Sequence, residues 1–275
     1  MPGDVKRSRN EVGDEAVEWW ADGGGFFGKR YMEGDNSVEG FRAEPMALSE
    51  RTRCEVDGVV RLLGLEKGRR ILDVPCGYGR HSIEFSRRGF DVVGVDINHE
   101  ELEVARGLAV ASESVVFERC DIRDIRYREE FDAIVNLFFS FGFFDADDDN
   151  ELCVRRFHNA LRPGGRFLMH TDVHIPRLLR GEHKFTECRR LRSGKQLLID
   201  ERFDTKRRRI EGSWTLLDPD GGETTLRAYS QRVYTYDEFA GVCKSAGFSS
   251  VNGYGDWDGR ALENSCDIMI VVATK

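Results

Sequence analysis

The sequence predicts an α/β fold, with a doubly wound and mostly parallel sheet followed by an antiparallel β insert. Between residues 50 and 139, a helical segment is followed by four short apolar segments that are typical of buried strands. Beyond residue 173 this parallel pattern stops, and extended segments separated by turn residues follow. The expected division is an N-terminal arm, a core in two pieces, and an insert: residues 1–48, 49–172 with 234–275, and 173–233.

The arm carries several aromatic residues among glycines. Aromatic side chains bury large areas wherever they dock, so we expect a short helical segment folded over the edge of the sheet. It would form either a lid or simply a packed arm. The aromatic residues are Trp19, Trp20, Phe26, Phe27, Tyr31 and Phe41. After the arm, Ser49 is expected to cap a helix over residues 50–63, whose apolar residues recur at helical spacing.

Residues 71–82 read Ile-Leu-Asp-Val-Pro-Cys-Gly-Tyr-Gly-Arg-His-Ser, a short strand that runs into a turn with two glycines. Gly77 and Gly79 lack a Cβ, so the backbone can bend tightly there and approach a bound molecule. The segment 81–88 can then open a helix. This order is typical of a nucleotide-binding loop, and a plain tight turn is the alternative.

Three further strands are predicted over residues 90–95, 115–119 and 131–139. Polar residues stand at or near their C-terminal ends: Asp96, Asp121 and Asn136. Because the carboxyl ends of parallel strands meet at one edge of a sheet, we expect these side chains to line that edge. Asp96 follows the first glycine by about 20 residues, where an acid accepts from ribose hydroxyls.

Two nucleotide-binding patterns compete. A dinucleotide fingerprint requires a third glycine where Ser82 stands, which disfavours hydride chemistry. The order of features instead resembles the class I S-adenosylmethionine-dependent methyltransferases, which are Rossmann-like. Their pattern is a strand that ends in an acid, Gly-x-Gly, and acids after the second and third strands. The matching residues are Asp73, Gly77, Gly79, Asp96 and Asp121.

The resemblance covers residues 50–172, including the turn at 161–167 into a fifth strand. A subgroup of small-molecule methyltransferases is more similar still, because it shares three further runs: residues 76–81, 140–144 and 254–259. The resemblance therefore implies S-adenosyl-L-methionine as cofactor and a methyl group transferred to nitrogen, oxygen or carbon of a small molecule. Methylation of protein or RNA, and a cofactor-binding module without turnover, are the alternatives.

The resemblance also implies roles for the residues that match. Gly77 and Gly79 would hold the methionine part, and Asp73 would reach its amino group directly or through water. Asp96 would take the ribose hydroxyls, with Ile97 beside it.

On the adenine side, Asp121 would accept from the amino group and the amide of Ile122 would face a ring nitrogen. Asn136 and Leu137 would border the sulfonium. For Asp73 and Asp121, the alternative to cofactor binding is that they only cap turns.

Methyl transfer from a sulfonium is an in-line displacement with an activated donor, so the protein mainly has to position the acceptor. A general base is optional. His170, just past the fifth strand, is the expected candidate, with a structural hydrogen bond as the alternative. Tyr31 and Asp172 are further catalytic candidates, and His174 and Tyr229 are expected to contact the substrate.

Phenylalanines crowd the segment after the fourth strand: Phe138, Phe139, Phe141, Phe143 and Phe144. They form either an aromatic wall, with Phe139 and Phe141 as substrate contacts, or an extension of the core. The acidic run over residues 145–149 is expected to precede a helix capped at or near Asn150 and to favour its N-terminal dipole.

The insert is predicted to contain three extended segments, residues 196–204, 207–218 and 223–234. In the second, Ile210, Trp214 and Leu216 share one face while Arg209, Glu211 and Ser213 share the other, so one face should be buried. That face would cover the substrate pocket or meet another subunit in a homodimer. A helix over 236–247 and a strand over 268–273 complete the core.

The net charge of −8 disfavours nucleic acid as the main partner, and the basic run at 206–209 fits a solvated turn. No apolar run has the length of about 20 residues that a membrane span needs. The polar N-terminus lacks a secretory signal, so cytoplasm is expected. The cysteines show no Cys-x-x-Cys pair and are expected to be free thiols, and no set of metal ligands stands out.

Overall fold

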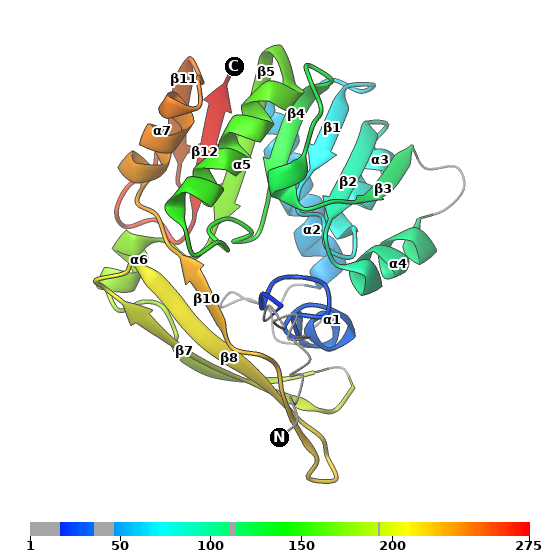
Figure 1. Cartoon of the computed structure of the whole chain (residues 1–275), viewed down its shortest axis with the longest axis vertical. Helices are drawn as coiled ribbons and strands as arrows, with labels where there is room; N and C mark the ends of the chain where they lie inside the picture. The colour runs from blue at the N-terminus through cyan, green and yellow to red at the C-terminus, as the bar shows by residue number, and fades with distance from the viewer. Residues whose placement is uncertain (1–16, 36–46, 110–113, 192) are drawn as a thin grey trace, which may run out of the picture.

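A computed structural model describes residues 17–35, 47–109, 114–191 and 193–275. Phe41 and the other residues of the predicted arm at 1–16 and 36–46 lie outside the described residues. A core of helices around one sheet stands above a second sheet, and helix α1 (Lys29–Asp35) lies between them (Figure 1).

The core sheet has the strand order β11-β12-β5-β4-β1-β2-β3. Neighbours from β3 to β5 are parallel, while β12 is antiparallel to β5 and to β11. Its strands are β1 (Arg70–Asp73), β2 (Asp91–Asp96), β3 (Val115–Arg119), β4 (Phe131–Asn136), β5 (Leu161–Thr171), β11 (Ser250–Tyr254) and β12 (Met269–Thr274). This arrangement confirms the predicted fold class. Strand order reverses beside β1, which is where ligands bind in doubly wound sheets.

Helices cover both faces of the core sheet (Figure 1). On one face, Val56 and Val59 of α2 pack with Phe85 of α3 against the sheet. On the other, Phe157 of α5 and Phe239 of α7 join the larger core cluster. The helices are α2 (Leu48–Leu63), α3 (Arg80–Arg87), α4 (His99–Leu108), the short 3-10 helix η1 (Ile122–Asp124), α5 (Asp147–Ala160) and α7 (Tyr236–Ser245).

Two predicted helix caps are wrong. Helix α2 begins one residue before Ser49, and Ala47 precedes it without a side-chain cap. Helix α5 begins at Asp147, so Asn150 lies inside its first turns and donates to the carbonyl oxygens of Phe144 and Ala146. The acidic run does fall in the first turn of α5, where negative charge suits the helix dipole.

The second sheet, called here the insert sheet, has the order β10-β8-β7-β6, with β9 paired to β8. All its pairs are antiparallel, as predicted. The third predicted segment is broken into two strands near Arg227. The backbone amide of Arg227 donates to the carbonyl of Gly25 in the arm, and its guanidinium donates to the carbonyl of Gly24. Its strands are β6 (Thr186–Arg190), β7 (Gln196–Asp204), β8 (Arg209–Leu217), β9 (Glu223–Thr225) and β10 (Tyr229–Arg232), and α6 (Ile175–Leu179) precedes them.

The arm, defined from here on as residues 17–35, connects the two sheets. Toward the core, Asp22 pairs with Arg119 at 2.7 Å. Toward the insert sheet, the ring of Tyr31 stacks on Trp214 with centroids 5.2 Å apart. The apolar face of β8 is therefore buried against the arm, although Arg209, expected on the opposite face, is buried as well.

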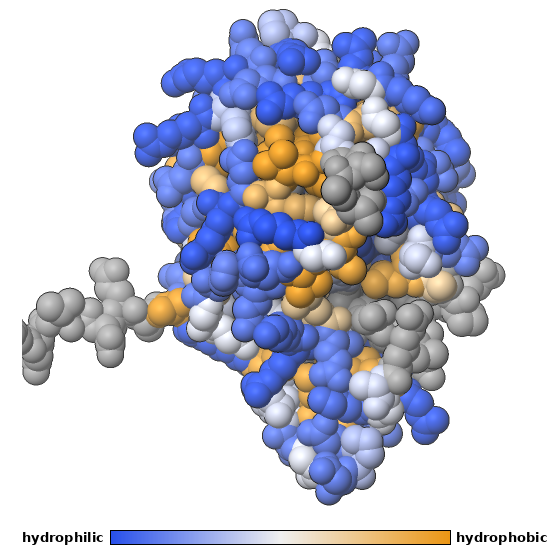
Figure 2. Space-filling model, turned by 90° about the vertical axis from the view of Figure 1, so that its right-hand side faces the viewer, coloured by the Kyte–Doolittle hydropathy of each residue, from blue (hydrophilic) through white to orange (hydrophobic). Residues whose placement is uncertain are grey.

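Among the described residues, no helix has the length and apolar character needed to cross a membrane. The face shown in Figure 2 is mostly hydrophilic, with apolar atoms gathered in the upper body and where the lower extension begins. Leu108 of α4 and Val116 of β3 are more than half exposed at the edge of the core sheet. All seven cysteines are free thiols, as predicted.

Candidate functional site

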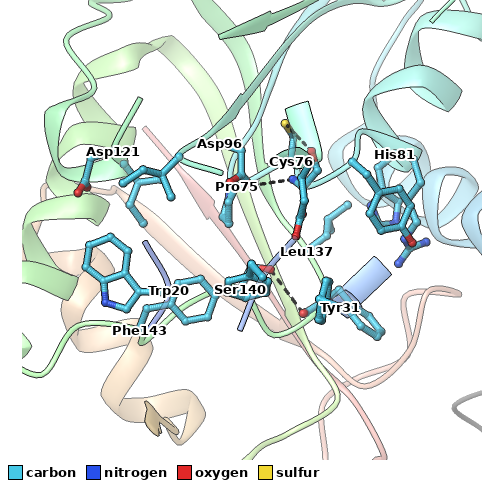
Figure 3. Close-up of a pocket in the computed structure, with 18 of the residues that line it drawn as sticks. Trp20, Tyr31, Pro75, Cys76, His81, Asp96, Asp121, Leu137, Ser140 and Phe143 are labelled. Carbon is cyan, nitrogen blue, oxygen red and sulfur yellow. Dashed lines mark hydrogen bonds between the residues drawn. The ribbon is translucent and has the colours of Figure 1, made fainter. Parts of the chain in front are cut away.

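A pocket opens at the C-terminal ends of β1, β2 and β4. Its empty volume is about 840 Å³, open solvent at its mouth included. In Figure 3, Asp96 and Asp121 lie along one side, opposite the rings of Trp20, Phe143 and Tyr31. The remaining lining residues are Phe27, Pro75, Cys76, Gly77, Tyr78, Arg80, His81, Ile97, Glu101, Ile122, Leu137, Phe138, Ser140 and Phe144.

The glycine turn between β1 and α3 forms one end of the pocket. Gly77 and Gly79 have φ angles of 54° and 78°, in the region that favours glycine. Gly77 lines the pocket, whereas a Cβ on Gly79 would meet the ring of Phe117 at 2.7 Å. The second glycine therefore serves the packing of the turn on β3, and the first brings backbone to the ligand side.

Asp96 is buried at the end of β2 and faces the pocket. Its carboxylate accepts from the amide of Gly77 at 2.8 Å and from the amide of Asn98 at 2.9 Å. Burial raises the pKa of Asp96, and these amides oppose the shift. The amide of Ile97 also contributes a hydrogen bond, and since a carboxylate has about four acceptor positions, room remains for a hydroxyl donor of a ligand. Ile97 lies beside it in the lining.

Asp73 lies beneath the turn and does not line the pocket. Its carboxylate accepts from the hydroxyl of Ser82 at 2.6 Å. Burial raises the pKa of Asp73 to about 7. Ser82, which occupies the place of the third glycine of a dinucleotide fingerprint, thus gives this buried acid its hydrogen-bond donor.

Asp121 and Ile122, which the sequence predicts to border the adenine, both line the pocket. The carboxylate of Asp121 caps η1 through the amide of Arg123 and pairs with the guanidinium of the same residue at 2.7 Å. That guanidinium lies over the rings of Trp20 and Phe144, at 5.1 and 4.5 Å. Asp121 therefore does cap a turn, and it also lines the pocket.

Aromatic rings form the wall opposite the strand ends. Trp20 contacts Phe144 edge to face, with centroids 5.1 Å apart, and Phe27 lies 5.8 Å from Phe143. These pairs join the arm to the loop after β4. Phe141, expected to contact substrate, instead packs in the core and is absent from the described lining.

Phe138 and Phe139 follow the end of β4 with φ angles of 62° and 55°. Left-handed backbone at a non-glycine residue costs about 1–3 kcal/mol and persists only where its surroundings hold it. Phe138 lines the pocket, whereas Phe139, one of the expected substrate contacts, does not. Asn136, expected beside the sulfonium, is buried and donates to the carbonyls of Val74 and Ser140, so it supports this loop.

Most predicted catalytic and substrate residues lie outside the pocket lining. His170 is inside β5, buried, with its ring 4.7 Å from that of Trp257. His174 hydrogen-bonds through Nε2 to the carbonyl of Cys266 at 3.1 Å, and the hydroxyl of Tyr229 donates to Glu201. Asp172 is also absent from the lining, and among the predicted catalytic residues Tyr31 alone lines the described pocket.

A charged cluster at the pocket was not predicted. Glu55 of α2 is buried and holds Arg80 at 2.6 Å and His81 at 2.8 Å. Burial would raise the pKa of Glu55, but Arg80 and the hydrogen bond from His81 lower it well below its usual range. Burial lowers the pKa of His81 to about 4. The sequence signal for Arg80 and His81 as lining residues was their position directly after the glycine turn.

Glu101 of α4 is a second lining residue that the sequence did not reveal. It is buried and accepts from the amide of Gly28 at 3.0 Å, and its neighbour Glu100 accepts from the amide of Lys29 at 3.1 Å. This acid therefore ties the arm to the pocket edge beside Gly77.

Comparison with known proteins gives one family. A family model described as "Methyltransferase domain" matches residues 65–208, just over half of the chain. Glycine/sarcosine N-methyltransferase of Parasynechococcus marenigrum is 28% identical over 82% of this chain and 78% of that protein. The protein YqeM of Bacillus subtilis is 34% identical over 40% of this chain, and the match spans less than half of YqeM, 43%.

Solved structures agree in fold. The CcbJ methyltransferase of Streptomyces caelestis has a TM-score of 0.69 at 18% identity, with 81% of this chain and 88% of that chain covered. The sugar N-methyltransferase KedS8 of a Streptoalloteichus species has a TM-score of 0.63 at 17% identity, with 99% of each chain covered. At these identities the similarity concerns the fold alone.

Proposed function

The chain belongs to the class I S-adenosylmethionine-dependent methyltransferases, and from this premise we propose that it methylates an amino nitrogen of a small molecule. The observation that carries the proposal is the composition of the pocket. Aromatic rings from the arm and from the loop after β4 line it together with the acids Asp96, Glu101 and Asp121. Aromatic faces and carboxylates both favour cationic ligands, such as a sulfonium and an ammonium group.

We assign the cofactor to the strand ends. The turn at Gly77 would approach the methionine part, and the acceptor capacity left on Asp96 fits the ribose hydroxyls. Asp121 and Ile122 would border the adenine, and Leu137 the sulfonium. When bound, the cofactor supplies an activated methyl group. Asp73, Gly79 and Asn136 would support this site from beneath.

The protein's contribution is then to position the acceptor and exclude water. Positioning can contribute about 7–11 kcal/mol to catalysis, more than a general base usually does. Tyr31 would orient the acceptor from the arm. We assign no base to His170, because it is buried, does not line the pocket and uses Nδ1 to accept from the amide of Phe138, and because a neutral amine needs no base to attack.

The nature of the relatives supports nitrogen as the acceptor atom. The glycine/sarcosine N-methyltransferase, which matches 82% of this chain, carries N-methylation in its name. A macromolecular acceptor would need an open groove, whereas arm residues line this pocket. We further propose a cytoplasmic protein, because free thiols suit a reducing compartment. A homodimer is also proposed, and it would form through a surface other than the apolar face of β8, which the arm covers.

Calorimetric titration with S-adenosylmethionine, its demethylated product and NAD tests the cofactor assignment. Binding of the first two alone is expected. The protein with S-adenosylmethionine is then incubated with matched sets of amines, amino acids, amino sugars and phenols, and products are identified by mass spectrometry. Methylation confined to phenols would overturn the choice of nitrogen, and failure to bind S-adenosylmethionine would overturn the proposed function.

A further inference from the structure

The loop after β4 carries two adjacent phenylalanines, Phe138 and Phe139, in left-handed backbone conformation. Elsewhere in the described residues, non-glycine positions with positive φ occur singly, at Glu129 and Arg208. L-residues with a Cβ adopt this conformation as single residues and rarely in succession. Specific contacts must therefore hold this turn in place.

The core supplies the first set of contacts. Nδ1 of His170 accepts from the amide of Phe138 at 3.2 Å, and the carbonyl of His170 accepts from the amide of Phe139 at 3.1 Å. The imidazole is fixed in turn, because it is 1% exposed and lies against Trp257. One buried residue of β5 thus binds both strained amides.

The insert sheet supplies the second set. The side-chain amide of Gln231, on β10, donates to the carbonyls of Phe139 and Phe141. Gln231 is 4% exposed, so its contacts are shielded from water. The next residue, Arg232, donates its own amide to the carbonyl of Gly142 at 2.8 Å. The turn is therefore held from both sheets at once.

We propose that His170 and Gln231 are positioning residues, which hold the Phe138–Phe139 turn so that Phe138 forms a wall of the acceptor pocket. The ring of Phe138 lies under the guanidinium groups of Arg51 and Arg80, at 4.4 and 5.4 Å, and Arg80 also lines the pocket. The inference rests on the proposed function. It gives His170 a role through backbone hydrogen bonds instead of proton transfer, and it links the insert sheet to acceptor choice.

The test compares His170→Asn with His170→Phe. Asparagine places an acceptor oxygen near the position of Nδ1 but cannot act as a base at neutral pH, whereas phenylalanine keeps the ring and loses the acceptor. A positioning role predicts that kcat/KM for the acceptor falls about ten- to hundred-fold in His170→Phe, because the buried amide of Phe138 loses its acceptor. In His170→Asn, which restores an acceptor, kcat/KM should recover. The Kd for S-adenosylmethionine should stay within about two-fold in both, since the glycine turn is untouched. Equal loss in both variants would indicate a base and overturn the inference.

Gln231→Leu tests the contribution of the insert sheet. It should raise KM for the acceptor more than it lowers kcat, with cofactor binding kept. Gln196→Leu, the same change at an exposed position of β7, and His158→Phe on α5 are the matched controls. Unchanged kinetics in Gln231→Leu would overturn its part of the inference.

Hydrogen exchange of the peptide over residues 137–144 gives a readout that needs no turnover. Faster exchange is expected in His170→Phe and Gln231→Leu, and wild-type exchange in His170→Asn and the controls. If the wild type failed to bind S-adenosylmethionine, the proposed function would be lost while this measurement still decided the positioning. Unchanged exchange in both test variants would refute the positioning even in an active enzyme.

Discussion

The amide of Gly77 donates directly to the carboxylate of Asp96, over 2.8 Å, across the ends of two neighbouring strands. The glycine turn and the acid after β2 are therefore one hydrogen-bonded unit. Asp96 also accepts from the amide of Asn98. A ligand that used the acid would meet a carboxylate already oriented by the turn.

Replacing this carboxylate should weaken cofactor binding. In Asp96→Asn the charge is lost and the amide group turns a donor toward Gly77 or toward the ligand. Hydrogen bonds to charged groups contribute about 1.5–3 kcal/mol, so the Kd for S-adenosylmethionine should rise about ten- to hundred-fold, as measured by calorimetry. Asp91→Asn, at the exposed start of the same strand, is the control. Equal affinities in the two variants would exclude Asp96 from the cofactor site.

Gly79→Ala should destabilise the protein more than Gly68→Ala. Both glycines have φ near 80°, but a Cβ on Gly79 would meet Phe117 at 2.7 Å, while a Cβ on Gly68 would meet no atom within 4 Å. Both variants bear the backbone strain, about 1 kcal/mol or more, and Gly79→Ala adds overpacking of about 1–3 kcal/mol. Urea unfolding measures the difference. Similar midpoints would mean that Phe117 moves aside freely.

Asp73→Asn should change how stability depends on pH. The pKa of Asp73 is raised by burial to about 7, from 3.8 in the unfolded chain. Between these values the native protein holds the extra proton, so this group makes stability fall as pH rises from about 4 to 7, by up to about 4 kcal/mol. The variant should gain stability over wild type across that window and keep a constant gain above it. Parallel unfolding curves from pH 4 to 8 would contradict the raised pKa.

Arg209→Met should destabilise the insert sheet. The guanidinium is 5% exposed and donates to the carbonyls of Phe144, at 3.1 Å, and Ser230, at 2.7 Å. Unpaired buried carbonyls should cost about 2–4 kcal/mol in the free energy of unfolding. Arg202→Met on β7 is the matched control, because that side chain is 81% exposed and its ion pair is worth little. Equal effects on chemical denaturation would mean that the carbonyls of Phe144 and Ser230 find water when the guanidinium is removed.

Short apolar strands were predictable from sequence because their ends carry strong signals. Residues 115–119 match β3, and 196–204 match β7, without a change of bounds. Strand β4 ends at Asn136, earlier than predicted, because the apolar pattern continues into Phe138 while the backbone turns left-handed. Hydrophobicity alone does not reveal such a turn.

The site was predictable where it depends on strand ends and not where it depends on side-chain direction. His170 lies on the same face of β5 as Leu168, which packs with α2. Because side chains alternate along a strand, a shift of the strand register by one residue would point His170 to the other face of the sheet. The cluster of Glu55 with Arg80 and His81 joins two helices that are far apart in sequence. No local pattern encodes such a meeting.

The placement of the arm has an evolutionary consequence. Tyr31 lines the pocket and also stacks on Trp214 of β8, so a ligand in the pocket would share this ring with the insert sheet. Changes within the arm can therefore reshape the pocket without altering a strand of either sheet. Descendants of this chain could acquire new acceptors through a short exchangeable segment while the core remained as it is.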